Sequence, residues 1–281
     1  MSEDNLGDRM KGYEMAEAGR MLINGLPIMI RLDGRSFSQF TKGLKRPYDE
    51  RMSNLMCATS KFIAEETNAK VVYTQSDEIT VVLYTDVVES QVFFDGRIQK
   101  LTSVVASMAT AYFNKHLYEY LPEKSDKLPV FDCRVWNVPT LEEAANCILW
   151  RELDATKNSI SMAAQAYYSH KELHGKNSSE KQEMLHQKGV NWNDYPSFFK
   201  RGSYFRRVTK LIKFSDAELD KLPAKHEARK NSNLMVERSV VEAVEFPPLI
   251  KVGNPVDVLF SGAEPSLKGT FNKQDLAKGK Y

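Results

Sequence analysis

Long apolar runs, paired cysteines and a leader-like N-terminus are missing from this sequence, and each absence excludes a class of protein. The apolar runs break within about ten residues, whereas a membrane-spanning helix needs roughly 20. The first residues, MSEDNLGDRMKGYEM, lack the basic and then apolar layout of a signal peptide. Cys57, Cys133 and Cys147 form no CxxC pair or Cys/His cluster, which disfavours structural zinc and predicts reduced thiols. We therefore expect a cytoplasmic protein with no membrane association.

A large excess of one charge is also missing. The 39 Lys and Arg residues nearly balance the 37 Asp and Glu residues, for a net charge of +2. The chain as a whole therefore lacks the large positive charge of a protein that wraps nucleic acid. The stretch 200–213, KRGSYFRRVTKLIK, nevertheless holds six cationic residues and no acidic one. Arginines interleaved with Tyr204 and Phe205 suit phosphate contact and base stacking, although a solvated surface remains an equal alternative.

Hydrophobic periodicity predicts strands and helices in a definite order. The stretch LPIMIRLD is a buried strand that ends at Asp33, and VVYTQSDEITVVLY is an antiparallel hairpin. Apolar residues at helical spacing predict helices over 51–67 and 98–114, and PVFDCRVWNV alternates as a further strand. This order is the βαββαβ plan of a ferredoxin-like sheet, so the predicted class is α+β.

The remainder of the chain follows a different pattern. Helices are expected over 141–155, 159–169 and 180–187, and the region after 215 is expected to be irregular, with EFPPLIKVGNPVDVLF as extended chain. We divide the chain into a first domain over 1–139, a mainly helical region over 140–214 and a C-terminal extension of unknown role over 215–281.

Two carboxylates stand where the plan predicts that strands end together. Asp33 closes the first strand and precedes Gly34, and Asp77 lies at the hairpin tip between Ser76 and Glu78. Carboxylates held close together are costly without a cation, and oxygen ligands without His or Cys favour magnesium. Gly34 would let the backbone approach an ion, and its carbonyl can be a ligand. The pair therefore predicts a magnesium site, although either stretch alone would more often be an ordinary turn or solvated loop.

Two magnesium ions held by shared carboxylates are typical of nucleotidyl transfer, in which one ion activates a hydroxyl and the other neutralises a triphosphate. The triphosphate would need cationic partners. Arg97 and Lys100 lie about one turn apart at the start of the second predicted helix, whose N-terminus adds partial positive charge. Lys45 and Arg46 are further candidates. The alternative for all four is solvent-exposed charge.

Six blocks resemble one family in their order along residues 10–207. They are RLDGRSFSQF, TQSDEITVVL, RIQKLTSVVASMATAYF, FDCRVWNVP, LWRELDATKNS and FKRGSYFRR. The sequence is thereby similar to tRNA(His) guanylyltransferases and their guanylyltransferase-like relatives, enzymes that resemble polymerase palms and add nucleotides to RNA 5′ ends in the 3′–5′ direction. The resemblance implies a palm-like catalytic domain over 1–139 and a finger-like, tRNA-binding region over 140–214.

The resemblance also implies a role for individual residues. Two Mg²⁺ ions would be held by Asp33, the Gly34 carbonyl and Asp77, both carboxylates being catalytic. Glu78 could assist with the metal, but a supporting role outside the metal contacts is favoured. ATP, GTP and other nucleoside triphosphates would be substrates, tRNA the macromolecular partner, and the assembly a homotetramer. The implied nucleotide contacts are Arg35, Ser36, Phe37, Ser38, Arg46, Asp49, Ser76, Arg97 and Lys100. The implied tRNA contacts are Arg151, Asn158, Lys200, Arg201, Arg206 and Arg207.

One block departs from the eukaryotic pattern. Where eukaryotic members have Cys-His-Ile-Asn-Asn-Leu-Tyr-Asn after the Trp-Arg block, this sequence has ATKNSISM, with Thr156 at the histidine position and Asn158 retained. The departure resembles bacterial, archaeal and phage-type relatives, which repair 5′-truncated tRNAs by templated addition after a 5′-monophosphate is adenylylated with ATP. Addition of a single G to tRNA(His) is the alternative within the family.

Two alternatives come from other classes of protein. A nucleotide cyclase would use the same palm and metals, but it would not need the helical region or the Arg/aromatic stretch. A tRNA-binding protein without catalysis would gain nothing from Asp33 and Asp77 on an RNA-facing surface.

Overall fold

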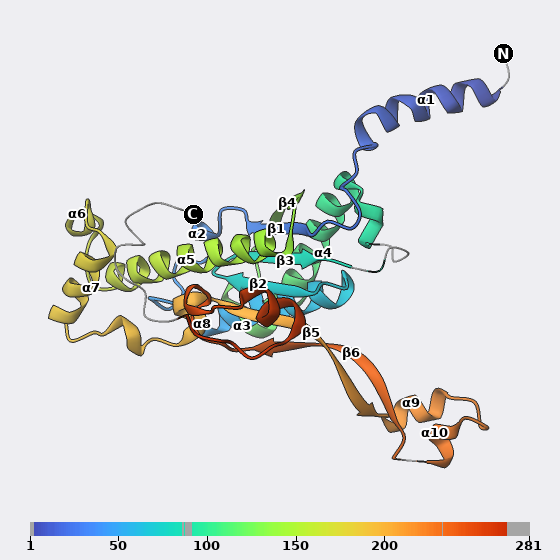
Figure 1. Ribbon diagram of the computed structural model, residues 1–281. Coiled ribbons are helices and arrows are strands. Elements are labelled where there is room, and N and C mark those ends of the chain that lie inside the picture. Colours follow the sequence, from blue (N-terminus) through green and yellow to red (C-terminus); the bar gives the residue numbers. More distant parts are fainter. Residues whose placement is uncertain (1–2, 86, 88–91, 232, 269–281) are drawn as a thin grey trace.

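A six-stranded antiparallel sheet forms the centre of the computed structural model, which describes residues 3–85, 87, 92–231 and 233–268 (Figure 1). Its order is β4-β1-β3-β2-β5-β6. The first four strands in that order form the predicted ferredoxin-like arrangement, so the α+β class is confirmed. The strands are β1 (Ile28–Gly34), β2 (Val71–Gln75), β3 (Glu78–Leu83), β4 (Phe131–Asn137), β5 (Ser203–Lys213) and β6 (Met235–Val244).

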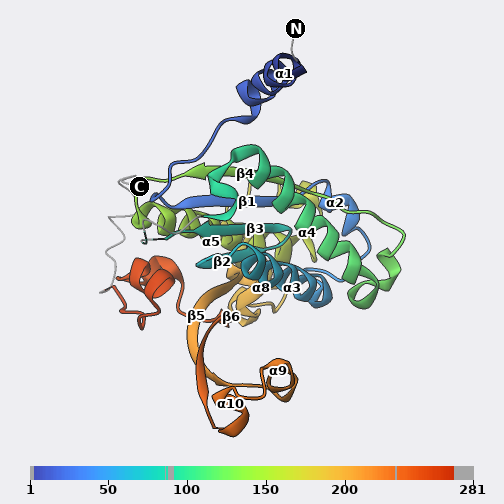
Figure 2. The same cartoon turned by 90° about the vertical axis from the view of Figure 1, so that its right-hand side faces the viewer.

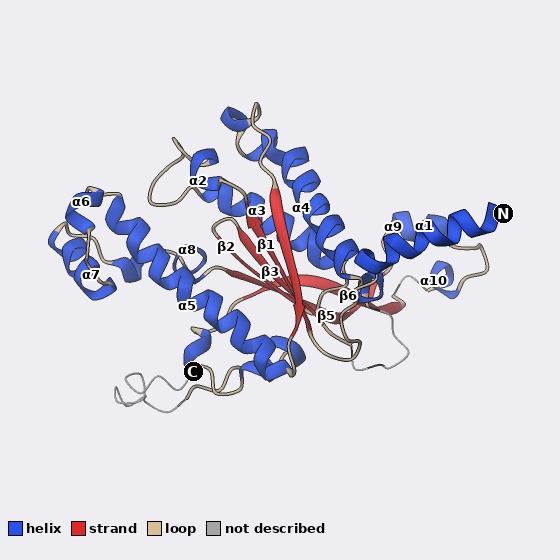
Figure 3. Cartoon of the chain, turned by 90° about the horizontal axis from the view of Figure 1, so that it is seen from above, coloured by secondary structure: helices blue, strands red, loops and turns tan. Residues whose placement is uncertain are grey.

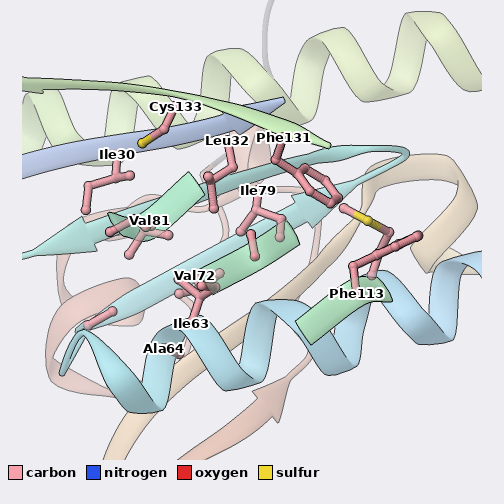
Figure 4. Close-up of a cluster of buried hydrophobic side chains, with 14 of the residues drawn as sticks. Ile30, Leu32, Ile63, Ala64, Val72, Ile79, Val81, Phe113, Phe131 and Cys133 are labelled. Atoms are coloured by element: carbon pink, nitrogen blue, oxygen red, sulfur yellow. The ribbon is translucent and has the colours of Figure 1, made fainter. Parts of the chain in front are cut away.

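One face of the sheet is covered by α3 (Glu50–Glu66) and α4 (Ile98–Tyr120), the two helices predicted between the strands. Alternate residues of β1, Ile30 and Leu32 among them, point to this face and meet Ile63 of α3 in the main hydrophobic cluster (Figure 4). Each of these three side chains is fully buried, which contributes about 1.5–3 kcal/mol apiece. The helix α4 continues six residues beyond the predicted end at 114.

The other face of the sheet carries α5 (Leu141–Gln165), and Figure 3 shows this helix and α4 on opposite sides of the strands. Met29 of β1 points to this face and packs in a second cluster with Ile148 of α5. The Thr140 side chain accepts a hydrogen bond from the Glu143 backbone N–H and caps the start of the helix. We expected two helices here; the structure has one, because the intervening residues 156–158 include no Gly or Pro to break it.

A small helical group lies beyond the sheet, at the left of Figure 1. The C-terminal part of α5 packs there against α6 (His170–Leu173) and α7 (Ser178–Gln187), with Ala163, Leu173 and Leu185 buried in a third cluster. The short α8 (Ser197–Arg201) also contacts α5 and leads directly into β5. The helix predicted over 180–187 is confirmed and begins two residues earlier.

The C-terminal region is more regular than we predicted. β6 pairs with β5 over ten residue pairs, whereas β5 pairs with β2 only over its first four residues. The hairpin therefore extends beyond the sheet, with α9 (Asp216–Lys221) and α10 (Glu227–Lys230) near its tip (Figures 1 and 2). The stretch MVERSVVEAV alternates as a partly exposed strand does, so the prediction of an irregular region is wrong for these residues.

Two further expectations concern the C-terminal region. The stretch 245–260, expected to be extended, contains helical turns at Leu249–Lys251 and Asp257–Ser261. The predicted limit at 214/215 falls inside the β5–β6 hairpin, so the C-terminal region shares the sheet with the first domain. Its last residues, 269–281, lie outside the described part of the chain.

The N-terminal helix α1 (Glu3–Ala18) stands away from the sheet (Figures 1 and 2). Its apolar side chains Leu6, Met10 and Tyr13 are exposed. Among the described helices, none is both long and apolar enough to cross a membrane.

Candidate functional site

The chain returns repeatedly to one end of the sheet. β1 ends there at Gly34, the two-residue turn Ser76–Asp77 joins β2 to β3 there, and β4 begins there opposite Gly34. The Gly34 backbone N–H donates to the Asp77 carbonyl oxygen at 3.1 Å, so the end of β1 and the hairpin tip are joined directly. The structure thus places Asp33 and Asp77 beside each other, at the edge where the sequence predicted them.

A row of carboxylates crosses three strands at this end. In the sheet register, Asp33 lies directly opposite Glu78 on β3 and directly opposite Asp132 on β4. Residues directly opposite one another share a face, and this face is the one that α5 covers, because Glu78 reaches Arg151 of that helix. Asp132 was not among the residues predicted from the sequence. The alternation within FDCRVW, together with the predicted strand order, places it on the same face as Asp33.

The acids of this row differ in their partners. Glu78 is paired bidentately with Arg151, whose Nε and Nη2 lie 2.6 and 2.7 Å from its two carboxylate oxygens. Both side chains are about nine-tenths buried, and Arg151 also donates to Asp154 at 3.0 Å. Glu78 is therefore held by a protein cation. This arrangement fits the predicted supporting role outside the metal contacts.

Asp33 and Asp77 have no such partner. Within the described chain, neither carboxylate forms an ion pair with Lys, Arg or His. Burial raises the pKa of Asp77, the charges of Asp33 and Glu78 raise it further, and a hydrogen bond from the Ser76 side chain opposes the shift. Asp77 is thus a buried acid without an ion-pair partner among the described residues.

The donor set suits magnesium. The described residues contain no group of three or more His, Cys, Asp or Glu side chains arranged to hold a metal. Magnesium, however, is commonly bound through one or two carboxylates and completes its shell with waters and substrate phosphates. Asp33, Asp77 and the Gly34 carbonyl offer only oxygen ligands, and the two acids need positive charge. The residues present therefore fit Mg²⁺.

The packing around position 34 also requires a glycine there. A Cβ atom at this position would lie 2.3 Å from Cδ2 of Phe37. Phe37 is almost fully buried and packs against Phe113 and Phe131. The glycine is therefore required by the ring beneath it, whether or not a ligand approaches its backbone.

The predicted nucleotide contacts near the strand end fall into two groups. Arg35, Ser36, Ser38 and Arg46 are exposed at this end, where a ligand could reach them, and Ser76 is exposed at the hairpin tip. Phe37 points into the core. Asp49 is buried and caps α3 by accepting a hydrogen bond from the Arg51 backbone N–H, and it also accepts one from the Lys45 backbone N–H in the preceding loop. The Arg51 side chain lowers the pKa of Asp49, so this carboxylate already has a structural partner.

Arg97 and Lys100 are not brought to the acids within one chain. The first turn of α4 is tied to the segment that precedes β1, since Ile98 N–H donates to the Arg20 carbonyl and Leu22 N–H donates to the Gly96 carbonyl. That segment lies at the end of the sheet opposite Asp33. A shared nucleotide between the predicted basic pair and these acids would require a second copy of the chain.

The predicted tRNA contacts also divide. Asn158 and Lys200 lie on α5 and α8 on the same side of the sheet as Arg151, and each has a contact within the chain. Arg206 donates to the Val258 carbonyl, and Arg207 donates to the Ala64 carbonyl at 2.6 Å near the end of α3. These two arginines therefore hold the fold together, and their role in binding tRNA stays a prediction. Arg201 lies at the end of α8, where its Nη2 donates to the Ser197 hydroxyl.

Comparison with known proteins places this site in a family. The family model described as tRNAHis guanylyltransferase matches residues 7–139, which include the whole acid row. Over 203 residues the chain is 30% identical to the tRNA(His) guanylyltransferase of Candida glabrata, covering 66% of this chain and 84% of that one. Over 238 residues it is 29% identical to the tRNA(His) guanylyltransferase of Neurospora crassa, covering 75% and 78%.

Solved structures show the same relationship. A bacterial tRNA(His) guanylyltransferase-like protein in complex with ATP superposes with a TM-score of 0.72 and 36% identity, covering 91% of this chain and 98% of that one. The tRNA(His) guanylyltransferase of Saccharomyces cerevisiae superposes with a TM-score of 0.59 and 28% identity, covering 72% and 95%. The bacterial-type protein is thus similar over the helical region as well as the sheet.

Proposed function

The chain belongs to the tRNA(His) guanylyltransferase family, and from that premise we propose that it is a nucleotidyltransferase that extends tRNA at its 5′ end in the 3′–5′ direction. The proposed physiological reaction is templated repair of a truncated 5′ end. The observation that carries the proposal is the pair Asp33 and Asp77, which meet at the end of a palm-type sheet without a protein cation.

The side chains at this end of the sheet have different proposed roles. Asp33, Asp77 and the Gly34 carbonyl would hold Mg²⁺, which when bound would supply positive charge to the phosphates and to the attacking oxygen. Glu78, fixed by Arg151, sets the start of β3 and so the position of Asp77 next to it. The exposed side chains of Arg46 and Ser76 are available to the phosphates of the nucleotide.

Two successive transfers are proposed on a monophosphorylated RNA. First, an oxygen of the 5′ phosphate attacks the α-phosphorus of ATP, and pyrophosphate leaves. The RNA then carries a 5′-linked AMP. Second, the 3′-hydroxyl of the incoming nucleoside triphosphate attacks the 5′ phosphorus of the RNA, losing its proton, and AMP leaves. An RNA with a 5′ triphosphate needs only the second transfer, with pyrophosphate as leaving group. ATP and GTP are bound by bacterial-type proteins of this family, which supports nucleotides as substrates.

Templated addition is favoured over addition of a single G to tRNA(His). Thr156 stands at the histidine position of the eukaryotic block, and the chain is more similar in identity and coverage to the bacterial-type protein than to the yeast enzyme. The block that the resemblance associates with recognition of tRNA(His) is therefore altered, which supports a broader choice of tRNA. The opposing nucleotide of the acceptor stem would then select the base.

The test uses a 5′-monophosphorylated tRNA that lacks its first nucleotide and is labelled at its 3′ end. Each NTP is offered singly with ATP and Mg²⁺, on four RNAs that differ only in the base opposite the gap. We expect the added nucleotide to follow the opposing base on tRNAs of several identities. Addition of G to tRNA(His) alone, whatever base stands opposite, would show the templated reading to be wrong.

The same assay separates the other classes. A cyclic nucleotide formed from an NTP without RNA would identify a cyclase. RNA binding that persists in EDTA, with no incorporation under any condition, would identify a binding protein without catalysis.

A homotetramer is part of the proposal. The exposed apolar residues of α1, which stands away from the sheet, are consistent with a further contact between copies of the chain. Sedimentation equilibrium measures the assembly directly, and a monomer at micromolar concentration would contradict it.

A further inference from the structure

An exposed tryptophan stands on α5 next to the acid row. Trp150 is 55% exposed, although it belongs to a helix whose other face packs on the sheet through Ala144, Ala145 and Ile148. It directly precedes Arg151, the residue that fixes Glu78. A large apolar ring left in contact with solvent at the edge of a functional site is more informative than a scattered surface apolar residue.

Two arginines hold this indole from the protein side. The guanidinium carbon of Arg151 lies 4.6 Å from the ring centroid, and that of Arg31 lies 5.6 Å from it. Arg151 is itself fixed by Glu78 and Asp154, so the ring rests on a rigid support. Cation–π contacts of this kind orient the ring without burying it. More than half of the residue therefore stays available to a ligand.

A row of positive charge lies next to the row of carboxylates. Arg31 is two residues before Asp33 on β1, about 7 Å along the strand and on the same face. Directly opposite Arg31 on β4 stands Arg134. In the part of the chain that the structure describes, Arg31 has no carboxylate partner, and Arg134 has only a long contact of 3.8 Å with Asp132.

Like charges directly opposite each other on neighbouring strands destabilise a sheet unless a counter-charge joins them. The Arg31–Arg134 pair is therefore stabilised by a bound anion. An exposed indole next to Arg31, which has no carboxylate partner among the described residues, and Arg134, which has only the long contact with Asp132, matches the two parts of a nucleotide within a strand, a flat base and a phosphate.

We propose that Trp150 is the stacking surface for the 5′-terminal base of the bound RNA, with Arg31 and Arg134 facing the adjoining backbone phosphates. This inference rests on the proposed function, since it names how the RNA end is positioned for it. The base is assigned to the RNA rather than to the incoming nucleoside triphosphate because of the side of the sheet. Trp150 shares α5 with Asn158, which is a predicted tRNA contact. Arg46, a predicted nucleotide contact, is exposed just before α3, and α3 packs on the opposite face of the sheet.

The test compares two substrates in a double-mutant cycle. One is the truncated, 5′-monophosphorylated tRNA of the preceding assay, and the other is the same RNA with an abasic nucleotide at its 5′ terminus. Wild type, Trp150→Ala and Trp150→Phe are measured on both under single-turnover conditions. Tyr118→Ala is the matched control, because Tyr118 is 72% exposed on α4, the helix on the opposite face.

On the intact RNA, we expect Trp150→Ala to raise the KM for RNA roughly 5- to 150-fold, the range for loss of one stacked base, and to leave the KM for NTP unchanged. Trp150→Phe keeps a ring and should recover most of the loss, and Tyr118→Ala should match wild type. On the abasic RNA, wild type should lose about the same factor and Trp150→Ala should lose nothing more. Equal losses for Trp150→Ala on both RNAs would reduce Trp150 to a structural residue and overturn the proposal. A raised KM for NTP with an unchanged KM for RNA would also overturn it, because the stacked base would then be that of the nucleotide.

A binding measurement reports on the same contact without catalysis. Indole emission of the wild type should be quenched on addition of the intact RNA in EDTA, and the quench should be smaller in Trp150→Phe, which keeps Trp136 and Trp192. On the RNA with the abasic 5′ terminus, the two proteins should be quenched to the same extent. A quench of the same size in wild type and Trp150→Phe on the intact RNA would contradict the assignment. Failure of the stacking inference is separable from failure of the proposed function. A wild type that adds no nucleotide refutes the function, whereas a wild type and a Trp150→Ala variant that add equally well refute only the stacking.

Discussion

Asp77 and Glu78 are consecutive residues of one hairpin, and their surroundings are opposite. The Glu78 carboxylate is buried against Arg151 and receives two short hydrogen bonds from it. The Asp77 carboxylate lies beside Asp33 with no protein cation, and its pKa is raised by burial and by its acidic neighbours. The two adjacent acids thus have different roles. Glu78 stabilises the fold through its ion pair with Arg151, whereas Asp77 has no ion-pair partner and is available to a bound cation.

The difference follows from where each residue stands in the turn. Ser76 has a positive φ of 50°, which turns the chain tightly within two residues, so Glu78 is already the first residue of β3 and points to the α5 face. Asp77 stays in the turn, at the level of Gly34. Glu78 lies where α5 covers the strand and is paired with Arg151 of that helix. Among the described residues, Asp33 near the end of β1 and Asp77 in the hairpin turn have no ion-pair partner, so both stay available to a ligand.

The largest expected effect of breaking this contrast is on catalysis. Asp77→Asn removes a proposed magnesium ligand while keeping the shape of the turn, so nucleotide addition should fall about 1000-fold or more with the unfolding transition retained. Single-turnover addition to a truncated tRNA measures the loss, and urea unfolding measures the fold. Asp126→Asn, an exposed acid paired with Lys127, is the matched control and should behave as wild type. Activity of Asp77→Asn within tenfold of wild type would remove Asp77 from the metal site.

The next effect is on stability. Arg151→Met leaves Glu78 buried without its cation, and loss of one partner of a buried pair costs about 3–5 kcal/mol in the free energy of unfolding. Adding Glu78→Gln removes the stranded charge and should recover part of that loss. Urea titrations of the three proteins give the values. A cost below about 1 kcal/mol for Arg151→Met would mean that Glu78 is as free as Asp77, and the contrast would fail.

A smaller effect on stability is expected from the packing of Gly34 against Phe37, at the end of β1 that is bonded to the turn. Gly34→Ala places a methyl group against the Phe37 ring and should cost about 1–3 kcal/mol in the free energy of unfolding. Phe37→Leu in the same chain makes room and should make the additional cost of Gly34→Ala smaller. A Gly34→Ala protein of unchanged stability would leave close approach of a ligand as the reason for the glycine.

The smallest effect has the opposite sign. Asp33→Asn removes a negative charge that faces Glu78, Asp132 and Asp77, and without Mg²⁺ it should stabilise the protein by roughly 0.2–1 kcal/mol at pH 7. Because the folded-state pKa of Asp77 lies above its unfolded-state value, charging Asp77 opposes folding as the pH rises. The gain should therefore fade as the pH falls and Asp77 takes up a proton. Thermal unfolding from pH 7 downwards, with and without Mg²⁺, checks both statements. A destabilised Asp33→Asn protein in EDTA at pH 7 would contradict the uncompensated charge.

The sheet and its acidic end could be predicted because their signals are local. β-branched residues on both sides of Ser76–Asp77 indicate a hairpin, and the burial of alternate residues in β1 follows from its apolar pattern. The strand order then brings Asp33 and Asp77 together. The hairpin β5–β6 was not predicted although MVERSVVEAV alternates, because only one residue of that strand is buried and its partner strand carries the cationic stretch considered for RNA binding.

The partners of charged side chains could not be predicted in the same way. Arg151 lies 73 positions from Glu78, and Arg207 lies 143 positions from the Ala64 carbonyl to which it donates. A cationic residue in a sequence fits a phosphate and a carbonyl equally well, and only the packing of α5 and β5 decides between them. Arg97 was predicted to hold a triphosphate near the acids, but its helix begins at the opposite end of the sheet. Hydrophobic periodicity predicts the helix and does not show at which end of the sheet it begins.

Binding of Mn²⁺, followed by electron paramagnetic resonance as a stand-in for Mg²⁺, tests most directly whether Asp33 and Asp77 are the acids left free for metal. The titration is made on wild type, Asp77→Asn and Asp126→Asn, each with a non-hydrolysable ATP analogue and without RNA. We expect bound Mn²⁺ in wild type and Asp126→Asn, and at least a tenfold weaker affinity in Asp77→Asn. Equal Mn²⁺ binding by all three proteins would show that the metal lies elsewhere, and the contrast between Asp77 and Glu78 would lose its functional meaning.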